Sequence, residues 1–500
     1  MKKQITRRDF LKGTASLAAV GLLGACASGN SGEQNNTTTD VKWDLESDVV
    51  ILGAGGSGMC AGIEARKAGA TALILEKTDA YGGTSIRSGG IIQASGTRVQ
   101  KELTNYKDDT GEKHAEYYIQ EASGLVDADL VKDMTTNSNS HIEWLESLGL
   151  VFTNMSGSAH VNCADESLYA DRIHGTDVGA AGMFNAVHDE AVNQGVEIKY
   201  NCCADKLIMV DGVVAGVEAT LDGNKVNVKA NKGVIICTSS FDHNVEMAKR
   251  LSPNHYYDLT TQHVVAYPGN TGDGIRMGME IGADITNLGG VIDLTSRTSA
   301  GINRQTPLLP CIFVNSDGVR YQCEDNTYAL TSKQRYEEII RTGKPVYTVF
   351  GASSLPYGAM TEDSLKAEAD AGTAFVGNTI AELAEKIGVN AKNLERTINI
   401  WNEDMATGVD TQYHRQSGLT PITGPYYAFE EGFLNLGAIG GLRINLDTQV
   451  LDVNGNAIPN LYAAGMASAG WIGQFYPGSG TALLGCVHFG RKAGKIVASK

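Results

Sequence analysis

The chain has 500 residues, with 41 lysines and arginines against 57 aspartates and glutamates, and a formal net charge of −16. This acidic balance, without a basic stripe to offset it, argues against binding to nucleic acid. The length exceeds that of one ordinary domain, and beyond the N-terminal segment no apolar run is long enough to span a bilayer.

Residues 1–26 have the features of a twin-arginine export signal. The pair Arg7 and Arg8 is followed by an apolar stretch that is short and rich in small residues, which disfavours a membrane-spanning helix. The stretch ends in LLGAC, the pattern of a lipobox, so we expect cleavage before Cys26 and a lipid anchor on its thiol. The twin-arginine route carries folded proteins, which suits a protein that takes up its cofactor in the cytoplasm. The expected location is the extracytoplasmic face of the membrane, or the periplasm.

Residues 27–43 are small and polar and are predicted to form a flexible linker. The nine cysteines include no CxxC or CxxCH pattern, which argues against a c-type haem and a zinc ribbon. Cys202 and Cys203 are adjacent, and we interpret them as buried thiols. The sequence predicts no metal site, although it leaves open an iron–sulfur cluster assembled from distant cysteines.

The mature part begins with a strand, a glycine-rich turn and a helix. The apolar run at 48–52 predicts a buried strand, and GAGGSG at 53–58 follows it as a GxGxxG turn. Gly53 permits the tight turn, Gly55 lets the backbone approach a pyrophosphate, and Gly58 lets the helix pack on the sheet. The pyrophosphate is expected at the N-terminus of the helix. The pattern therefore predicts dinucleotide binding.

The residues after the second predicted strand favour FAD over NAD. This strand, residues 72–75, leads into Glu76, which is placed to hold a ribose hydroxyl. The next stretch, KTDAYGGTSIRSGG, contains further glycines and small residues. Small side chains and free N–H groups suit a chain that lies along the ribityl group and the isoalloxazine ring.

Three later stretches complete a family pattern: GVIICTSSFDHNVEM at 233–247, NTGDGIRMGMEIGAD at 270–284 and IPNLYAAGMASAG at 458–470. With the GxGxxG entry, the chain resembles the flavoprotein subunits of the fumarate reductase and 3-ketosteroid dehydrogenase superfamily over nearly its whole mature length. The resemblance implies an α/β fold with a Rossmann-like, glutathione-reductase-like FAD domain. An α+β capping domain is inserted in it.

The resemblance assigns 44–287 and 436–500 to the FAD domain and 288–435 to the cap, with the substrate between them. It also implies a set of FAD-binding residues. These are Gly53, Gly55, Gly56, Ser57, Gly58, Glu76, Lys77, Gly82, Gly83, Thr84, Ser85, Ser88, Gly89, Gly90, Thr238, Ser239, Asp273, Gly465, Met466, Ser479, Thr481, Ala482 and Leu483.

The features that fumarate-type members use to bind carboxylates are missing. Their cap motif VNxxGxRFxNExxTR ends in an arginine, and the matching position here is Tyr328. Their upstream relay would fall at about Arg304 and Pro307 and is not reproduced. Where they carry a histidine pair and NRLGGNA, this chain has LGAIGG and YPGSGTA. Because arginine forks bind carboxylates bidentately, their loss disfavours a small dicarboxylate substrate.

The same positions resemble 3-ketosteroid Δ1-dehydrogenases. That family carries RYxNExxxY, LGTKGG, GGFDHD and YPGAG, and this chain carries RYQCEDNTY, LGAIGG, SSFDHN and YPGSG. The resemblance implies that Tyr328 is the catalytic tyrosine, and that Tyr476 and the N–H of Gly480 hold a substrate carbonyl. The family's helper tyrosine cannot be placed by the motifs, and the unranked candidates are Tyr117, Tyr118 and Tyr169. Asp293 falls at the approximate place of a histidine of the fumarate-type members, which leaves open a position near the substrate or a turn cap, and we favour the turn cap.

The implied chemistry moves a hydride and a proton across a C=C bond conjugated to a ketone. The flavin exchanges the hydride at the carbon β to the carbonyl. A phenol O–H and a backbone N–H would stabilise the enolate oxygen. A second phenol would exchange the α-carbon proton, and the usual tyrosine pKa of about 10 favours the acid role and hence reduction.

The favoured hypothesis is a respiratory-type reductase of an apolar enone, such as a 3-oxosteroid, fed by a membrane-linked, quinol-dependent electron carrier. One alternative is the reverse reaction, a ketosteroid dehydrogenase that passes electrons to quinone. Another is a reductase of an unsaturated acid similar to fumarate, urocanate or cinnamate, for which Arg297 or Arg304 would have to face the flavin. An exported flavin-binding lipoprotein without enzymatic activity is the fourth.

Overall fold

The computed structural model describes residues 41–157, 165–261, 263–295, 310–357 and 360–500. The predicted signal peptide, Cys26 and nearly all of the predicted linker lie outside these residues. The same is true of Arg297, Arg304 and Pro307.

A parallel sheet forms the core of the FAD-binding part, in the strand order β6-β2-β1-β9-β18. Strands β1 and β2 carry the unbroken apolar runs VVIL and ALIL, as expected for parallel strands buried on both faces. The predicted strand at 72–75 is confirmed, and the strand predicted at 48–52 begins three residues earlier. The bounds are Leu45–Leu52 for β1, Ala72–Leu75 for β2, Glu197–Lys199 for β6, Asn224–Ile236 for β9 and Ala457–Ala463 for β18.

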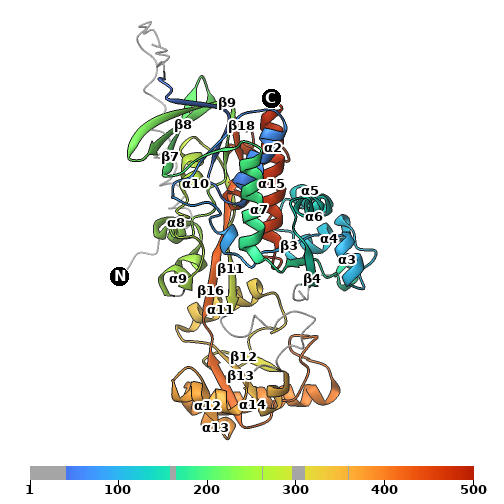
Figure 1. The fold of residues 1–500 in the computed structure, drawn as a ribbon. Coiled ribbons are helices and arrows are strands. Elements are labelled where there is room, and N and C mark those ends of the chain that lie inside the picture. Colours follow the sequence, from blue (N-terminus) through green and yellow to red (C-terminus); the bar gives the residue numbers. More distant parts are fainter. Residues whose placement is uncertain (1–40, 158–164, 262, 296–309, 358–359) are drawn as a thin grey trace, which may run out of the picture. The chain divides into compact units, whose positions relative to one another are not determined.

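Three antiparallel strands extend this sheet: β17 beside β18, and the pair β7 and β8 beside β9. Their bounds are Gln449–Leu451, Cys202–Val210 and Val213–Leu221. The helices α2, α7 and α15 lie together beside the sheet (Figure 1). They span Gly56–Lys67, Gly179–Asn193 and Thr481–Ala498. A Cβ atom at Gly494 would lie 2.0 Å from the Ala61 carbonyl oxygen, so only glycine permits this close crossing of α15 and α2.

The remaining elements of this part are short. A three-stranded sheet β3-β5-β4 is accompanied by helices whose first turns are capped by side chains, for example the Thr97 hydroxyl that accepts from the Gln100 N–H. The strands span Ile91–Gln93, Phe152–Ser156 and Ile173–Thr176 for β3, β4 and β5. The helices are α3 (Arg98–Leu103), α4 (Gly111–Glu121), α5 (Ala128–Thr136), α6 (Ser138–Ser147), α8 (Val245–Leu251), α9 (Pro253–Thr261) and α10 (Asp273–Glu280).

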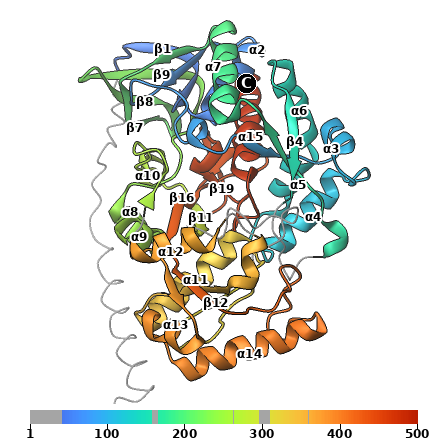
Figure 2. The same ribbon diagram turned by 60° about the horizontal axis from the view of Figure 1, so that its bottom comes forward.

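Two long strands, β11 (Ile285–Thr295) and β16 (Phe433–Arg443), pair antiparallel and run side by side (Figures 1 and 2). The short strands β10 (His263–Val264) and β19 (Ser468–Ala469) pair with β16. The predicted domain boundaries at 287/288 and 435/436 fall inside this strand pair, so paired strands rather than loops connect the two parts. The interpretation of Asp293 as a turn cap is wrong, because it lies within β11, paired with Asn435 and buried.

The inserted part is built on an antiparallel sheet in the order β12-β13-β15-β14, with an apolar core of its own. Tyr426 and Tyr427 lie in β15, where the Tyr427 ring stacks on Phe350 with centroids 5.4 Å apart. The elements are β12 (Cys311–Val314), α11 (Tyr328–Thr342), β13 (Tyr347–Gly351), α12 (Glu362–Asp370), β14 (Phe375–Gly377), α13 (Ile380–Ile387), α14 (Ala391–Thr407) and β15 (Tyr426–Glu430).

The RYQCE segment of this part forms a buried ion-pair network. The guanidinium of Arg320 bonds to Glu324 at 2.6 and 2.8 Å and to Asp410 at 2.7 Å through two nitrogens. The three side chains are at most 1% exposed. Paired bidentate contacts of this kind satisfy charges that would otherwise be costly to bury. The segment therefore holds the inserted part together and does not itself line the cavity described below.

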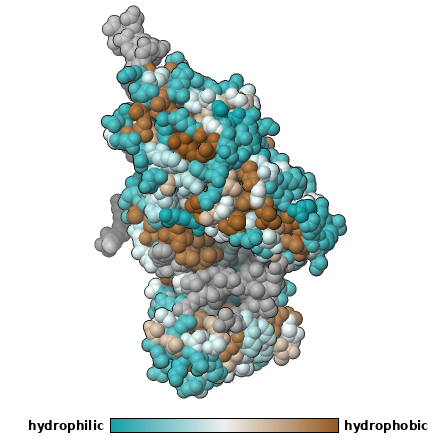
Figure 3. All heavy atoms as spheres, in the orientation of Figure 1, coloured by the Kyte–Doolittle hydropathy of each residue, from teal (hydrophilic) through white to brown (hydrophobic). Residues whose placement is uncertain are grey.

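On the face shown in Figure 3, hydrophobic residues gather in several patches separated by hydrophilic ones. Among the described helices, none combines the length and apolar character needed to cross a membrane.

Candidate active site

One cavity of about 370 Å³ lies at the carboxyl ends of the parallel strands. Strand β1 has β2 on one side and β9 on the other. The connections that follow β1 and β9 therefore diverge at the carboxyl end of β1. Ligands in open α/β sheets bind at such a topological switch point. Leu52, Leu75 and Cys237, the residues at or just beyond the ends of these three strands, all line the cavity.

The GxGxxG turn forms one wall. A Cβ atom at Gly55 would meet no atom within 4 Å, so the backbone there is open to a ligand. A Cβ atom at Gly58 would lie 2.0 Å from the Gly53 carbonyl oxygen, which explains why the helix can begin this close to the strand only with glycine. Helix α2 begins at Gly56, so its positive dipole end is available to a pyrophosphate, while the Gly56 N–H itself donates to the Ser85 hydroxyl at 3.3 Å. The wall therefore fits the phosphates of a dinucleotide.

Glu76 stands at the end of β2, beside the turn. Its two carboxylate oxygens accept hydrogen bonds from the N–H of Ala54 at 2.8 Å and from the N–H and hydroxyl of Thr78 at 3.0 and 2.9 Å. These bonds fix the carboxylate at the cavity wall, and the oxygen that accepts from Ala54 retains a second lone pair for a hydroxyl donor.

The sequence reasoning did not place Cys202, Cys203 and Ala204 at the site, although all three line the cavity from the start of β7. Burial raises the pKa of the Cys202 thiol to about 11, so the thiol is neutral. Cys202 is buried as predicted, whereas Cys203 is half-buried. The pairing of the β7 backbone with its neighbours, rather than any motif, brings these residues to the cavity.

Lys77 and Asp273 line the same cavity and bond to each other. The Lys77 ammonium lies 2.7 Å from the carboxylate of Asp273, at the start of α10, and 2.9 Å from the hydroxyl of Thr271. This pair ties the end of β2 to the TGDG helix start. Both residues were predicted to bind the cofactor, and their mutual bond defines the edge against which it would lie.

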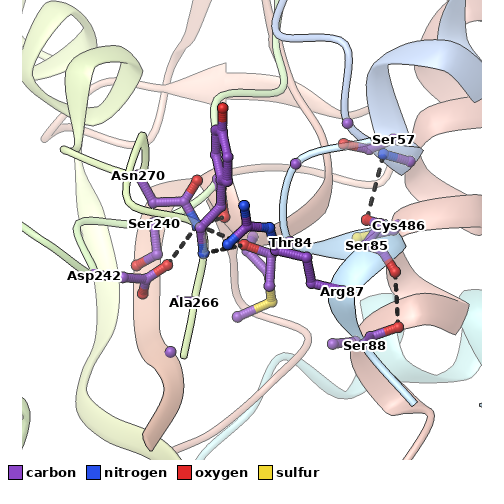
Figure 4. A pocket seen from close by; sticks show the side chains of 18 of the residues that line it. Ser57, Thr84, Ser85, Arg87, Ser88, Ser240, Asp242, Ala266, Asn270 and Cys486 are labelled. Carbon is purple, nitrogen blue, oxygen red and sulfur yellow. Dashed lines mark hydrogen bonds between the residues drawn. The ribbon is translucent and has the colours of Figure 1, made fainter. Parts of the chain in front are cut away.

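A polar cluster surrounds Asn270, on the side of the cavity away from Ser57 (Figure 4). The Asn270 amide nitrogen lies 2.7 Å from Asp242, 2.8 Å from the hydroxyl of Thr84 and 3.1 Å from the hydroxyl of Ser239. The second oxygen of Asp242 accepts from the N–H of Ala438 at 2.7 Å. Burial raises the pKa of Asp242. Asp242 and Asn270 were not predicted as site residues, although both lie in the motifs SSFDHN and NTGDG.

Arg87 is a further residue of the cavity lining that was not predicted from the sequence. Its guanidinium carbon lies 4.8 Å from the centre of the Tyr267 ring, a cation–π contact, and both residues line the cavity. Arg87 follows the predicted residues Thr84 and Ser85 in the same short turn.

All three predicted catalytic residues, Tyr328, Tyr476 and Gly480, line this one cavity, although they come from distant parts of the chain. Among the predicted cofactor residues, those lining it are Gly53, Gly55, Gly56, Ser57, Glu76, Lys77, Gly83, Thr84, Ser85, Ser88, Gly89, Thr238, Ser239, Asp273, Met466, Ser479, Ala482 and Leu483. Five others lie outside the lining, namely Gly58, Gly82, Gly90, Gly465 and Thr481. Gly82, for example, is behind the wall, with its N–H donating to the Ala54 carbonyl at 2.8 Å.

Tyr328 and Tyr476 are neighbours in the cavity lining. Tyr328 is the first residue of α11, whose N-terminus is capped by the Thr327 hydroxyl. The two phenol rings are tilted, with centroids 6.0 Å apart, and the Tyr328 hydroxyl lies 3.4 Å from the hydroxyl of Ser479. Helix α11 thus delivers Tyr328 to the loop that precedes α15.

Burial keeps both phenols protonated. It raises the pKa of Tyr328 well above 10, the neighbouring Tyr476 raises it further, and burial likewise raises the pKa of Tyr476. The Tyr476 oxygen accepts a hydrogen bond from the N–H of Ala482 at 2.9 Å, in the first turn of α15. Its own proton is therefore free to be donated elsewhere.

The structure separates the three helper candidates. Tyr118 donates to the Trp471 carbonyl at 2.6 Å, and burial, with the nearby Tyr476 next, raises its pKa. Tyr117 and Tyr169 instead pack edge to face with centroids 5.9 Å apart in a separate cluster. Tyr118 is thus the candidate nearest to Tyr476, one layer behind the cavity wall.

The wall between the tyrosines and the Asn270 cluster is apolar, formed by side chains from β11, β16 and the segment before them. These are Val265, Ala266, Ile292, Leu294 and Leu436. Such a lining suits a hydrophobic substrate that is oriented by a few polar groups. Within the described ranges, no group of three or more histidine, cysteine or acidic side chains is arranged to hold a metal ion.

Comparison with known proteins identifies the class. A family model described as an FAD binding domain matches residues 48–483, and a model of the twin-arginine translocation signal matches residues 4–24. The chain belongs to this FAD-binding family, whose members related to it include fumarate reductases and 3-ketosteroid dehydrogenases. It is an FAD-dependent oxidoreductase with a signal for export across the cytoplasmic membrane.

Three relatives illustrate the range of the family. Digoxin reductase of Eggerthella lenta is 30% identical, and the alignment covers 100% of this chain and 98% of the relative. Urocanate reductase of the same species is 29% identical over 92% of this chain and 75% of the relative. A 3-ketosteroid-Δ4-(5α)-dehydrogenase from Rhodococcus jostii, solved with 4-androstene-3,17-dione, superposes with a TM-score of 0.80. It is 27% identical, covering 93% of this chain and 99% of that one.

Proposed function

We propose that the protein reduces a C=C bond conjugated to a ketone in an apolar, 3-oxosteroid-like substrate. The observation that carries the proposal is the pair of protonated phenols, the half-buried Tyr328 and the buried Tyr476, in the lining of one cavity. Digoxin reductase and the structure of the 3-ketosteroid-Δ4-(5α)-dehydrogenase support this substrate class.

The donors at the α15 end of the cavity suit a ketone oxygen. Reduced FAD, when bound, would supply the hydride for the β-carbon. As negative charge develops on the ketone oxygen, the Tyr476 O–H and the Gly480 N–H donate hydrogen bonds to it. The bond from Ala482 to the Tyr476 oxygen polarises the phenol and makes it a better donor. Two such donors in a dry site stabilise an enolate strongly.

Tyr328 donates the proton to the α-carbon. Its raised pKa keeps it in the acid form at neutral pH, which supports reduction over oxidation. The Ser479 hydroxyl, 3.4 Å away, is placed to pass a proton back to the phenolate that remains. In the oxidative direction Tyr328 would have to act as a base, against its burial.

We also propose that the lipid anchor on Cys26 holds the enzyme at the membrane, next to a quinol-linked electron donor. Cys26→Ala should move the protein from the membrane fraction to the soluble fraction without changing its FAD content. Fractionation followed by immunoblotting checks this, with Ser28→Ala as the matched control. A Cys26→Ala protein that stays with the membranes would contradict the anchor.

The reaction is tested anaerobically with reduced viologen as electron donor and androst-4-ene-3-one or an androsta-1,4-dienone as acceptor. The native protein should oxidise the viologen in the presence of the enone. Tyr328→Phe should lose about 100-fold or more in kcat while retaining FAD, since a positioned acid contributes factors of this size. If no enone reoxidises the reduced flavin, the proposal is wrong.

A second candidate is a reductase of an unsaturated acid. It is favoured by Arg87, a cation on the cavity wall, and by the similarity to urocanate reductase. The same assay with urocanate and cinnamate separates the two candidates. Turnover of an acid that is abolished in Arg87→Met, with no turnover of enones, selects the acid reductase.

A further inference from the structure

Gln93 lies behind the loop that carries Ser479 and Gly480, outside the cavity lining, at the end of β3. Its side-chain nitrogen donates to the Ser479 carbonyl at 3.2 Å, and its backbone N–H donates to the Gly480 carbonyl at 3.3 Å. One residue thus holds two successive carbonyl groups of the loop. Gln93 is 5% exposed, so these bonds are shielded from water.

The orientation of the Gln93 amide is determined by its partners. The Ser479 carbonyl can only accept, so the amide nitrogen must face it and the amide oxygen must face His114. The Nε2 atom of His114 lies 3.1 Å from that oxygen and must carry a proton. Burial lowers the pKa of His114 well below its usual value, with Arg172 and His174 lowering it further, so the ring stays in this neutral form.

The bond to the Ser479 carbonyl also sets the direction of the Gly480 N–H. The two groups belong to one peptide unit, and in a trans peptide the C=O and the N–H point in opposite directions. The carbonyl points back to Gln93, outside the lining, while Ser479 and Gly480 line the cavity. The N–H consequently points toward the cavity. Gly480 has φ of +92°, a region open to glycine, so without this bond the peptide unit is free to turn over.

We propose that Gln93, supported by His114, is a positioning residue that aims the Gly480 N–H at the substrate oxygen. The inference rests on the proposed function, because it gives that N–H the role of an enolate donor. It goes further by naming the group that keeps the donor in place. Gln93 touches neither the cavity nor the reacting atoms, and it acts only through the peptide unit between Ser479 and Gly480.

The test uses the FAD-loaded protein and 4-nitrophenol, whose ionised form resembles an enolate and whose ionisation is visible in its absorbance. The native protein should bind the phenolate and lower the pKa of the bound phenol. Gln93→Met, similar in size but without the donor, should weaken phenolate binding about tenfold or more and return that pKa toward its value in water. The matched control is Gln100→Met, another buried glutamine, bonded to Asp109 and the Asp171 carbonyl but not to the loop. It should leave both values unchanged.

Gln93→Glu provides an independent arm if Gln93→Met does not fold. Its carboxylate would face the Ser479 carbonyl oxygen and repel it, whereas the protonated acid can donate as the amide does. At each pH, the affinity of Gln93→Glu for the phenolate is divided by that of the native protein. This ratio should rise as the pH falls from 8 to 5. A constant ratio over that range would contradict the positioning role.

The phenolate assay distinguishes a failure of the proposed function from a failure of this inference. If the native protein does not bind the phenolate, both the proposed enolate site and this inference are wrong. If the native protein binds it, and Tyr476→Phe weakens binding but neither Gln93 variant does, the inference alone is wrong.

Discussion

The oxygen of Tyr476 accepts a hydrogen bond from the first turn of α15 while its ring lies against Tyr328. Because the oxygen is already engaged, the phenol can serve the substrate only as a donor. Tyr476→Phe removes this donor without changing the shape of the wall. We expect kcat for enone reduction to fall about 100-fold, a usual cost of losing one such donor, with FAD content and melting temperature nearly unchanged. Steady-state kinetics and the flavin absorbance check this, and loss of FAD would instead assign the loop to the cofactor.

Asp258 and Asp293 form a buried pair of carboxyl groups behind the cavity, bridged to β16 by Asn435. Burial raises the pKa of Asp258 to about 7. Burial, with the charge of Asp258 next, raises the pKa of Asp293 as well. The pKa of an aspartate in the unfolded chain is about 4. A buried aspartate with a raised pKa contributes its full stability when the pH is below that value, and this contribution is lost as the pH rises through 7.

Asp258→Asn should therefore stabilise the protein at pH 8.5, on the order of 2–4 kcal/mol, and change little at pH 4. Melting curves at the two pH values measure the effect. The exposed Asp317→Asn serves as control and should shift neither curve. Equal shifts of the Asp258→Asn protein at both pH values would show that the effect is one of packing rather than ionisation.

Individual site residues were predictable from the sequence where they belong to a motif that directly follows a predicted strand. Gly55, Glu76 and Thr84 were found in this way, and all line the cavity. Gln93 and Arg87 were not, because their roles depend on which distant loop or ring they meet. Asp293 was misjudged because a lone aspartate near glycines favours a turn, whereas here burial beside Asp258 and pairing in β11 override that preference.

At the scale of elements, the inserted part depends on the charges of Arg320, Glu324 and Asp410. Burial acts to raise the pKa of Asp410, but the hydrogen bonds and charge of Arg320 outweigh it and lower that pKa to about 2. A lowered pKa contributes stability above the unfolded value of about 4, and this is lost as the pH falls toward 2. Acid should therefore loosen this part of the molecule.

Arg320→Met removes the cation that bonds to both buried carboxylates, and Glu324 then keeps a longer ion pair, 3.4 Å, to Arg415. We expect a loss of about 3–5 kcal/mol in the free energy of unfolding, measured by urea denaturation. Arg341→Met, which removes an exposed partner of Glu338, is the control and should have little effect. An Arg320→Met protein as stable as the control would mean that the buried network contributes nothing to the fold.

Strands β1 and β2 were predictable because each carries a continuous apolar run, VVIL and ALIL. Strand β6 reads EIK and carries no such run. The long pair β11 and β16 was not predicted as a pair, since their partners are far apart in sequence and both strands contain glycines that weaken the strand pattern. For the same reason the predicted domain boundaries fell within them.

At the scale of the whole molecule, the first and last helices of the FAD-binding part are pressed together. Gly494→Val would place its Cβ 2.0 Å from the Ala61 carbonyl oxygen and force α15 away from α2. We expect a cost of about 3 kcal/mol or more and partial loss of FAD, measured by the ratio of flavin to protein absorbance. Lys495→Val, on the exposed side of the same helix, is the control. Full retention of FAD by Gly494→Val would show that the crossing can widen without opening the site.

The crossing of α2 and α15 also bears on the order of events during synthesis. The ribosome makes residues 56–67 long before residues 481–498, yet the turn before α2 and the loop before α15 line the same cavity. A nascent chain cannot complete the FAD site while α15 is still in the exit tunnel. Cofactor loading must therefore wait until α15 has emerged, and export before that point would deliver a protein without its cofactor. A translocation route that accepts folded cargo gives the cytoplasm the time to finish.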